Sequence, residues 1–195
     1  MTQAQATRLR EILLDPVEVS ALELAGAARA AVLVPLYERD GELCAVLTRR
    51  RDDLPRHAGQ VAFPGGRSDP GDGDLIATAL REAHEEIGLE PSAVTLLGAL
   101  APVSIPVSGF AVYPFVAAIE RPTSWRPASG EVELVFELTL DELVAGHAHE
   151  TRATPVGRLE TPTFTAGKQT IWGATAFILA DLLHRLGLLD AEYVR

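Results

Sequence analysis

Three glutamates, Glu82, Glu85 and Glu86, stand within five residues of one another. On an α-helix, residues three and four positions apart share a face, so these carboxylates are expected to lie on one arc of about 100°. A solvated helix face would carry them at a cost of roughly 0.2–0.5 kcal/mol per repelling pair. A hard divalent cation such as Mg²⁺ or Mn²⁺ would be bound by them, because it prefers oxygen ligands. The surrounding residues decide between these two interpretations.

A glycine-containing segment precedes the glutamates. Phe63-Pro64-Gly65-Gly66 opens it, and we expect the whole stretch from Pro64 to Asp74 to be irregular. Gly65 and Gly66 let the backbone approach a ligand closely and turn sharply. Placed before an acidic helix, such a loop would bring carboxylates and backbone carbonyls, that of Gly66 among them, around one cation. The combination predicts a metal site.

Upstream, a polar connection over residues 49–60 contains Arg49, Arg50, Arg51 and Arg56. Guanidinium groups are forked donors that match phosphate oxygens. Hydrolysis of a diphosphate requires charge neutralisation on its oxygens, a positioned water and help for the leaving phosphate. Glutamate-bound metal ions and arginines together would meet these needs. Each arginine by itself is equally consistent with a solvated loop.

The segment that ends at Leu89 resembles the Nudix hydrolase signature, G-x5-E-x7-R-E-U-x-E-E-x-G-U, where U is aliphatic. The second half matches at Arg81, Glu82, Glu85, Glu86, Gly88 and Leu89, with Ala83 as a small version of U. The first half departs from the signature. Gly66 and Asp72 take the places of its glycine and its acid, with one extra residue before Arg81.

Residues 46–66 are similar to the stretch that precedes this signature in coenzyme A pyrophosphatases, roughly L-L-T-x-R-[SA]-x3-R-x3-G-x3-F-P-G-G. The matching residues are Leu47, Thr48, Arg50, Gly59 and Phe63 to Gly66. Arg51 replaces a small residue, and Pro55 stands where an arginine is expected, with Arg56 next to it. Ile171-Trp172-Gly173-Ala174-Thr175 resembles the same subfamily.

The resemblance implies an α/β protein with the Nudix fold, a mixed β-sheet sandwiched between α-helices. It implies hydrolysis of the diphosphate of coenzyme A or its derivatives to 3′,5′-ADP and a 4′-phosphopantetheine product, with Mg²⁺ or Mn²⁺ as cofactor. Carried over to this chain, Glu82, Glu85 and Glu86 are the catalytic and metal-binding residues, with Gly66 as a further ligand. Glu85 is a ligand or the general base, and Glu131 is a second candidate for the base. Arg81 orients the glutamates, and the substrate-binding residues are Arg50, Arg56, Gly65 and Gly66.

Other functions stay open at this point. A Nudix enzyme acting on ADP-ribose, NADH or a related nucleoside diphosphate derivative is the first alternative. A non-catalytic nucleotide-binding module is the second, although a degenerate relative is expected to lose acidic ligands that this chain keeps. A structural protein with an acidic helix is the third.

The composition excludes several classes of protein. The 195 residues carry a net charge of −10, which argues against nucleic-acid binding, so we expect a small-molecule substrate. The chain has no apolar run of about 18 residues and no charged start followed by an apolar core, so we expect a cytoplasmic protein without a membrane partner. The single cysteine, Cys44, excludes an internal disulfide and is expected in the core. Monomer and homodimer are both open.

We expect one domain over residues 1–195. It would comprise a helical appendage (1–28), a sheet with the glutamate-bearing helix (30–145) and a C-terminal helix (170–187). The glutamates fall on a helix from Leu75 to Ile87, with an apolar stripe of Ile76, Leu80, Ala83 and Ile87 and with Gly88 as C-cap. We expect a loop over 146–169, in which His147 and His149 are an exposed pair, and a final helix over 171–186 capped by Thr170. The remaining expected elements are helices over 7–14, 17–27 and 141–145, and strands over 30–36, 43–48, 61–63, 94–103, 110–119 and 131–140, with Asp40-Gly41 as a hairpin turn.

Overall fold

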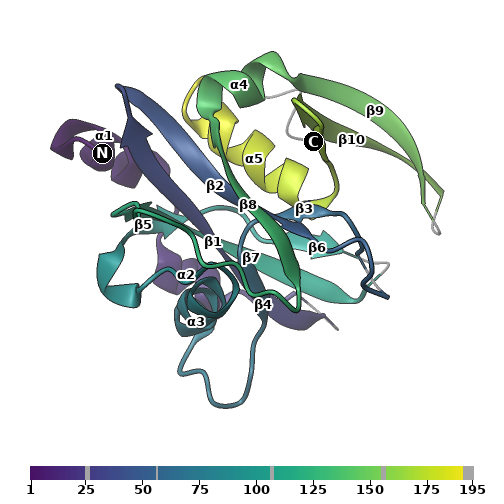
Figure 1. Ribbon diagram of the computed structural model, residues 1–195, viewed down its shortest axis with the longest axis horizontal. Coiled ribbons are helices and arrows are strands. Elements are labelled where there is room, and N and C mark those ends of the chain that lie inside the picture. The colour runs from purple at the N-terminus through teal and green to yellow at the C-terminus, as the bar shows by residue number, and fades with distance from the viewer. Residues whose placement is uncertain (25–26, 56, 106–107, 155–156, 191–195) are drawn as a thin grey trace.

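The computed structural model describes residues 1–24, 27–55, 57–105, 108–154 and 157–190, and its strands form two sheets (Figure 1). The larger sheet consists of β1 (Ala28–Arg39), β2 (Glu42–Arg50), β3 (Val61–Ala62), β4 (Gly65–Arg67), β5 (Val94–Ala99), β6 (Val103–Ile105), β7 (Phe110–Ile119) and β8 (Val132–Thr139). The smaller sheet consists of β9 (His147–Thr154), β10 (Gly157–Ala166) and β11 (Gln169–Ile171).

The larger sheet is mixed and lies between helices. β1 is central: it pairs in parallel with β7 and antiparallel with β2 and β4. Successive residues of β1, Leu33 and Val34, point to opposite faces and are both buried, so each face of the sheet is covered. The predicted α/β class is confirmed. One face packs against α2 (Pro16–Ala21) and α3 (Leu75–Ile87), and the other against α1 (Gln3–Ile12), α4 (Leu140–Ala145) and α5 (Ala174–Arg185).

Helix α3 has the predicted bounds. The Asp74 side chain caps it by accepting from the Ala77 N–H at 2.7 Å, and Gly88 ends it in the left-handed conformation, at φ 69° and ψ 27°. The predicted apolar stripe is rotated by part of a turn, since Ile76 and Leu80 are only half-buried. The fully buried positions of the helix are Leu75, Thr78, Ala79, Ala83, Glu86 and Ile87. The rotation places the Glu86 carboxylate inside the protein.

The segment from Pro64 to Asp74 is not wholly irregular, which corrects the sequence prediction. Gly65 and Gly66 begin β4, which pairs with Val32 and Ala31 of β1. Two glycines argue against a strand by propensity, but here they allow the strand to lie against its neighbours. The predicted strand over 94–103 is split into β5 and β6, and the break falls beside Pro102, which has no backbone N–H to donate.

The stretch over 146–169 is also not a loop. β9 and β10 form an antiparallel hairpin in continuous register from His147 opposite Phe164 to Thr154 opposite Gly157. His147 is therefore half-buried in a strand, with its ring 5.1 Å from that of Phe164, while His149 is exposed. Thr170 lies in β11 and does not cap α5, whose N-cap is Gly173. β9, β10 and β11 are neighbours in the chain, but the mostly polar sequence of β9 has no alternating apolar pattern from which a strand could be predicted.

The N-terminal helices are displaced from their predicted positions. α1 begins at Gln3, because Thr2 and Gln5 form a capping box in which each side chain accepts from the other residue's backbone N–H. α2 ends at Ala21, well before the predicted end at 27. Cys44 is buried, as predicted. Within the described ranges, none of the helices combines the length and apolar character that a bilayer span requires.

Gly65→Ala is expected to destabilise the protein by about 2–4 kcal/mol, because a methyl group there would lie 2.5 Å from Cα of Val32 and the residue has φ +157°. Urea denaturation monitored by circular dichroism measures the change. Gly71→Ala is the matched control. It meets no atom within 4 Å, so it should stay within about 0.5 kcal/mol of wild type. Equal midpoints for the two variants would show that β4 is not packed as described.

Candidate active site

Glu86 lies at the junction of α3 and β4. Its side chain is 11 % exposed, and its Oε2 accepts a hydrogen bond from the Gly65 N–H at 3.2 Å. Burial raises the pKa of Glu86 to about 7; the Gly65 N–H opposes this rise, the Glu82 carboxylate adds to it, and Arg50 opposes it more weakly. Few positive groups offset the charge of this buried carboxylate, so binding of a proton or a cation is favourable. Glu86 is therefore well suited to bind a metal ion.

Glu82 stands one turn before Glu86 and faces the next residue of β4. A Cβ at Gly66 would lie 2.5 Å from Glu82 Oε1, so the carboxylate lies directly against this glycine and would have to shift if a side chain were present. Burial also raises the pKa of Glu82, against the lowering effect of Arg81. The structure thus brings Gly65, Gly66, Glu82 and Glu86 together, as a metal site would require.

Arg81 joins the outer carboxylates of the site. Its Nη1 donates to Glu82 Oε1 and to Glu85 Oε2, each at 3.0 Å. Its Nε and Nη2 donate to Asp72 Oδ1 and Oδ2 at 2.8 and 3.0 Å. This forked pair holds the pKa of Asp72 well below its usual range. Asp72, the residue displaced by one position from the signature acid, therefore anchors Arg81.

Only one of the three consecutive arginines faces the glutamates. Arg50 Nη1 lies 3.3 Å from Glu131 Oε2 and 3.9 Å from Glu86 Oε1. The Arg50 Nε is buried and has no hydrogen-bond partner. The Arg50 side chain as a whole is 27 % exposed, so a phosphate oxygen can reach its guanidinium from the solvent side.

The two neighbouring arginines are paired elsewhere. Arg49 binds Glu133 and also Asp52, at 2.7 Å. Arg51 binds Asp53, at 2.7 Å, and donates to the Ser129 carbonyl at 2.8 Å. Arg56, predicted to bind substrate, lies outside the described residues. The position of Arg50 follows from its place at the end of β2, which the arginine-rich sequence alone does not distinguish.

The segment between β7 and β8, residues 120–131, carries Glu131 to the site. Its backbone is tied to the end of α3, because the Ala128 N–H donates to the Glu86 carbonyl at 2.8 Å. Its first half is held by Glu137, which accepts from Arg121 Nε and Trp125 Nε1, each at 2.7 Å. Glu137 has no counterpart in the sequence motifs, and its four donors, which also include Tyr37 and Arg39, come from distant parts of the chain.

The donor set fits a hard divalent ion, although the carboxylates do not yet converge. Among the described residues, no three acidic, histidine or cysteine side chains are gathered closely enough to enclose a metal. Arg81 Nη1 binds Glu82 and Glu85, while Glu86 binds the Gly65 N–H of β4. All available ligand atoms are oxygens, which Mg²⁺ and Mn²⁺ prefer. Burial raises the pKa of Glu82 and of Glu86, so a positive ion beside these two carboxylates would be favourable. Binding would require Glu82 and Glu85 to turn from Arg81 toward the ion.

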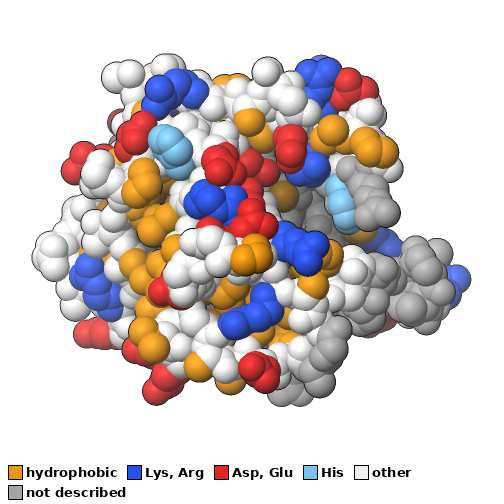
Figure 2. Space-filling model, turned by 90° about the horizontal axis from the view of Figure 1, so that it is seen from below, with side chains coloured by type: hydrophobic (Ala, Val, Ile, Leu, Met, Phe, Trp, Pro, Cys, Tyr) orange, Lys and Arg blue, Asp and Glu red, His pale blue; other side chains and the backbone are white. Residues whose placement is uncertain are grey.

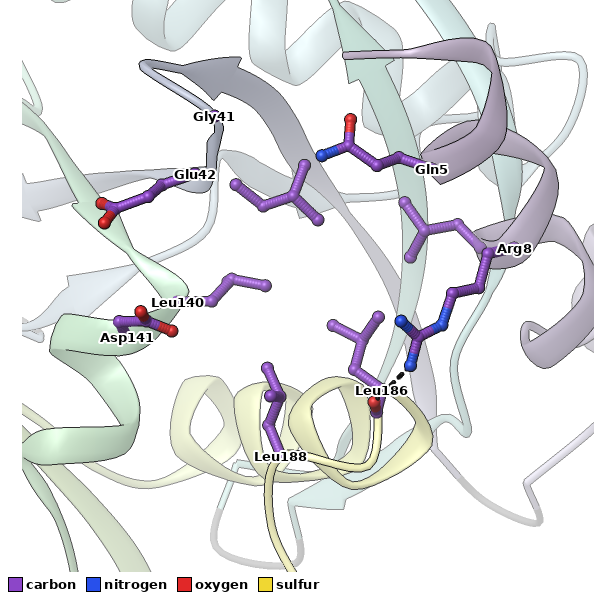
Figure 3. Close-up of a pocket in the computed structure, with 10 residues that line it drawn as sticks. Gln5, Arg8, Gly41, Glu42, Leu140, Asp141, Leu186 and Leu188 are labelled. Carbon is purple, nitrogen blue, oxygen red and sulfur yellow. Dashed lines mark hydrogen bonds between the residues drawn. The ribbon is translucent and has the colours of Figure 1, made fainter.

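Figure 2 shows the molecule from below, where acidic and basic side chains gather beside a hollow. A separate cavity of about 270 Å³ opens on the opposite face of the larger sheet, between α1, the β1–β2 turn, α4 and the end of α5 (Figure 3). Half of its lining residues are leucines, and Arg8 at its edge already donates to the Leu186 carbonyl at 3.0 Å. The carboxylate cluster has no part in that cavity, so we place the candidate site at the α3–β4 junction.

Comparisons with known proteins agree with the geometry. The NUDIX domain family model matches residues 27–158. Proteins named as uncharacterized Nudix hydrolase NudL, from Salmonella newport and Salmonella enteritidis, are 41 % identical over 162 residues, which cover 82 % of this chain and 83 % of theirs.

Two solved structures show the same fold. A Caenorhabditis elegans Ap4A hydrolase binary complex has a TM-score of 0.51 at 22 % identity, over 61 % of this chain and 85 % of that one. The NUDIX domain of Shewanella oneidensis NrtR, complexed with ADP ribose, has a TM-score of 0.50 at 21 % identity, over 74 % and 88 %. At these identities the likeness concerns the fold alone.

Glu86→Gln is expected to stabilise the metal-free protein at pH 8. The pKa of Glu86 is about 7 in the folded protein, against an ordinary 4.5, so the folded state binds more protons between these values. The free energy of unfolding of wild type therefore falls as pH rises through this window, by at most about 3 kcal/mol. The neutral amide avoids that loss. Thermal denaturation in EDTA should show the variant melting above wild type at pH 8, with most of the difference gone at pH 4.5.

Added Mn²⁺ should raise the melting temperature of wild type and leave that of Glu86→Gln unchanged. Glu85→Gln is the matched control: its side chain is 56 % exposed, so without metal it should stay within about 1 kcal/mol of wild type. A Glu86→Gln variant that melts below wild type in EDTA at pH 8 would contradict the assigned burial.

Proposed function

The chain belongs to the NUDIX domain family, and we propose from this that it is a metal-dependent hydrolase of the diphosphate in coenzyme A or its derivatives. The buried Glu86 beside Gly65, with Arg50 facing it, is the observation on which this proposal depends. It combines a cation site with a phosphate donor in one place. The products would be 3′,5′-ADP and a 4′-phosphopantetheine compound, and the enzyme would act in the cytoplasm on a small molecule, as a monomer or a homodimer.

Each residue of the site has a distinct proposed role. A bound divalent ion would neutralise the diphosphate oxygens and activate a water. Glu82 and Glu86 would hold the ion, joined by Glu85 and the Gly66 carbonyl. The partly exposed guanidinium of Arg50 would donate to a non-bridging oxygen, while Arg81, held by Asp72, would orient Glu82 and Glu85.

Two carboxylates are candidates for the general base. Glu85 is 56 % exposed and bound to Arg81, whereas Glu131 is 60 % exposed and bound to Arg50. Both are open to solvent, so either can meet a water at the edge of the site. A base must lie within hydrogen-bond reach of the water that it activates, and substitution of each residue in turn distinguishes them.

The choice of coenzyme A is supported by the likeness of residues 46–66 to coenzyme A pyrophosphatases. Arg51 departs from that pattern, but its side chain is occupied by Asp53 and the Ser129 carbonyl, so it leaves the site free. Pro55 also departs, and it removes one donor expected for phosphate. ADP-ribose is the first alternative substrate, and a domain of the same fold has been solved with that ligand. A non-catalytic nucleotide-binding module is the second.

Product analysis with Mg²⁺ or Mn²⁺ tests the proposal, with coenzyme A, ADP-ribose and NADH as parallel substrates. Release of 3′,5′-ADP from coenzyme A, with the other two left intact, would support it. Cleavage of ADP-ribose or NADH instead would support metal-dependent hydrolysis but reject coenzyme A as the substrate. No cleavage with either metal would favour the binding module.

Glu86→Gln should lower kcat by at least about a thousandfold, equivalent to about 4 kcal/mol of transition-state stabilisation, because it removes the most buried ligand of the ion. Steady-state kinetics at saturating Mg²⁺ measures the loss. Comparison of Glu85→Gln with Glu131→Gln identifies the base. Only the variant that lacks the base should lose the acidic limb of the pH–rate profile. A Glu86→Gln enzyme within tenfold of wild type would remove Glu86 from the site.

Arg50→Ala should lower kcat/KM by about ten- to hundredfold, the range expected for a charge-assisted hydrogen bond to phosphate. Arg49→Ala is the matched control, because the neighbouring Arg49 is paired with Asp52 and Glu133 and should leave kcat/KM within about threefold of wild type. Both variants need melting curves to show that they are folded. Equal losses of kcat/KM in the two variants would mean that Arg50 does not face the site in a way that Arg49 does not.

A further inference from the structure

The glutamates and Arg50 account for binding of a diphosphate, but not for binding of the nucleoside attached to it. A purine base is commonly bound by stacking on an aromatic ring. The exposed large hydrophobic side chains among the described residues are Val17, Leu22, Leu134, Trp172 and Leu188. Trp172 is the one aromatic residue in this group, and 40 % of it is exposed.

Trp172 lies beside the strand that connects the arginine and the glycines of the site. It follows β11, and three residues later the Thr175 hydroxyl donates to the Val61 carbonyl of β3 at 3.1 Å. Val61 pairs with Arg49, the neighbour of Arg50 on β2. From Val61 the chain continues through two residues after β3 into Gly65. Trp172 thus follows a strand that contacts β3, and β3 in turn pairs with β2 and leads into Gly65.

A second residue gives this tryptophan a charged neighbour. The guanidinium of Arg152, from β9, lies over the Trp172 ring at 5.3 Å from its centroid. Glu150 binds its Nη2 at 2.9 Å, while its Nε is buried and has no hydrogen-bond partner. The Arg152 side chain as a whole is 32 % exposed, so the pair presents an aromatic surface and, next to it, a guanidinium that a ligand can reach.

We propose that Trp172 and Arg152 form the subsite for the nucleoside end of the substrate. The base stacks on Trp172, and a phosphate carried by the ribose binds Arg152 in place of Glu150. This assignment rests on the proposed function and adds specificity to it. Coenzyme A carries such a ribose phosphate, whereas ADP-ribose and NADH do not. The subsite therefore selects nucleotides with a phosphomonoester on the ribose.

Fluorescence titration tests the subsite without catalysis. The chain contains two tryptophans, so Trp125→Phe leaves Trp172 as its only indole. In EDTA, 3′,5′-ADP should quench this indole saturably and bind at least tenfold more tightly than 5′-AMP. Quenching that does not saturate, or equal affinity for the two nucleotides, would overturn the proposal.

Calorimetry in the otherwise wild-type protein separates the two residues. Trp172→Ala should weaken binding of both nucleotides by about ten- to hundredfold, the range for loss of one base stack. Arg152→Gln should weaken only 3′,5′-ADP and so remove the preference. Trp172→Phe keeps a ring and should bind within about fivefold of wild type, which guards against misfolding of the alanine variant. Leu188→Ala is an exposed hydrophobic control beyond the other end of α5 and should change nothing.

The outcomes keep the subsite and the proposed function apart. If Trp172→Ala hydrolyses coenzyme A with unchanged KM and binds 3′,5′-ADP as wild type does, the subsite is rejected and the function stands. If 3′,5′-ADP binds through Trp172 but coenzyme A is not cleaved, the subsite stands and the hydrolase is rejected. Binding of neither nucleotide would reject the subsite and leave the exposed tryptophan as a contact for another macromolecule.

Discussion

A carboxylate buried against a glycine strand is the constraint on which the rest of the site depends. Glu86 is inside the protein because α3 packs directly on the larger sheet, and its carboxylate accepts a hydrogen bond from the Gly65 N–H. A side chain at position 65 would collide with the backbone of β1. One at position 66 would displace the Glu82 carboxylate from its place against β4. The close approach of β4 to β1 therefore depends on glycine at position 65.

Two arginines pair with the carboxylates of the site. Arg81 holds the outer group, Asp72, Glu82 and Glu85, while Arg50 lies between Glu86 and Glu131 on the inner side. This arrangement limits the repulsion among clustered carboxylates without removing the burial that raises the pKa of Glu86. A cation entering between the groups would take over part of the role of Arg81. The same guanidinium would then keep its forked contact with Asp72 and hold the helix surface in place.

The family model matches only part of the chain. The family match ends at residue 158, within β10, so β11 and α5 lie beyond it. α5 is held to β3 by the Thr175 hydroxyl, which donates to the Val61 carbonyl, and β11 completes the smaller sheet. Arg152 lies within the matched region and Trp172 lies beyond it, so the proposed subsite draws on both parts of the chain.

The sequence by itself determined the features that are local. The bounds of α3, the left-handed Gly88 cap and the spacing of the three glutamates follow from short-range periodicity and capping, and the turn at Asp40-Gly41 follows from its dipeptide. The tertiary structure alone decided the features that depend on distant pairing. β4 is a strand because β1, far upstream in the chain, lies beside it. Only the side of the sheet to which each side chain points distinguishes Arg50 from Arg49 and Arg51. Only packing shows that Glu86 is more buried than Glu82. Local propensity carries no information about which distant strand a residue will meet, and that meeting sets burial, charge pairing and the shape of the site.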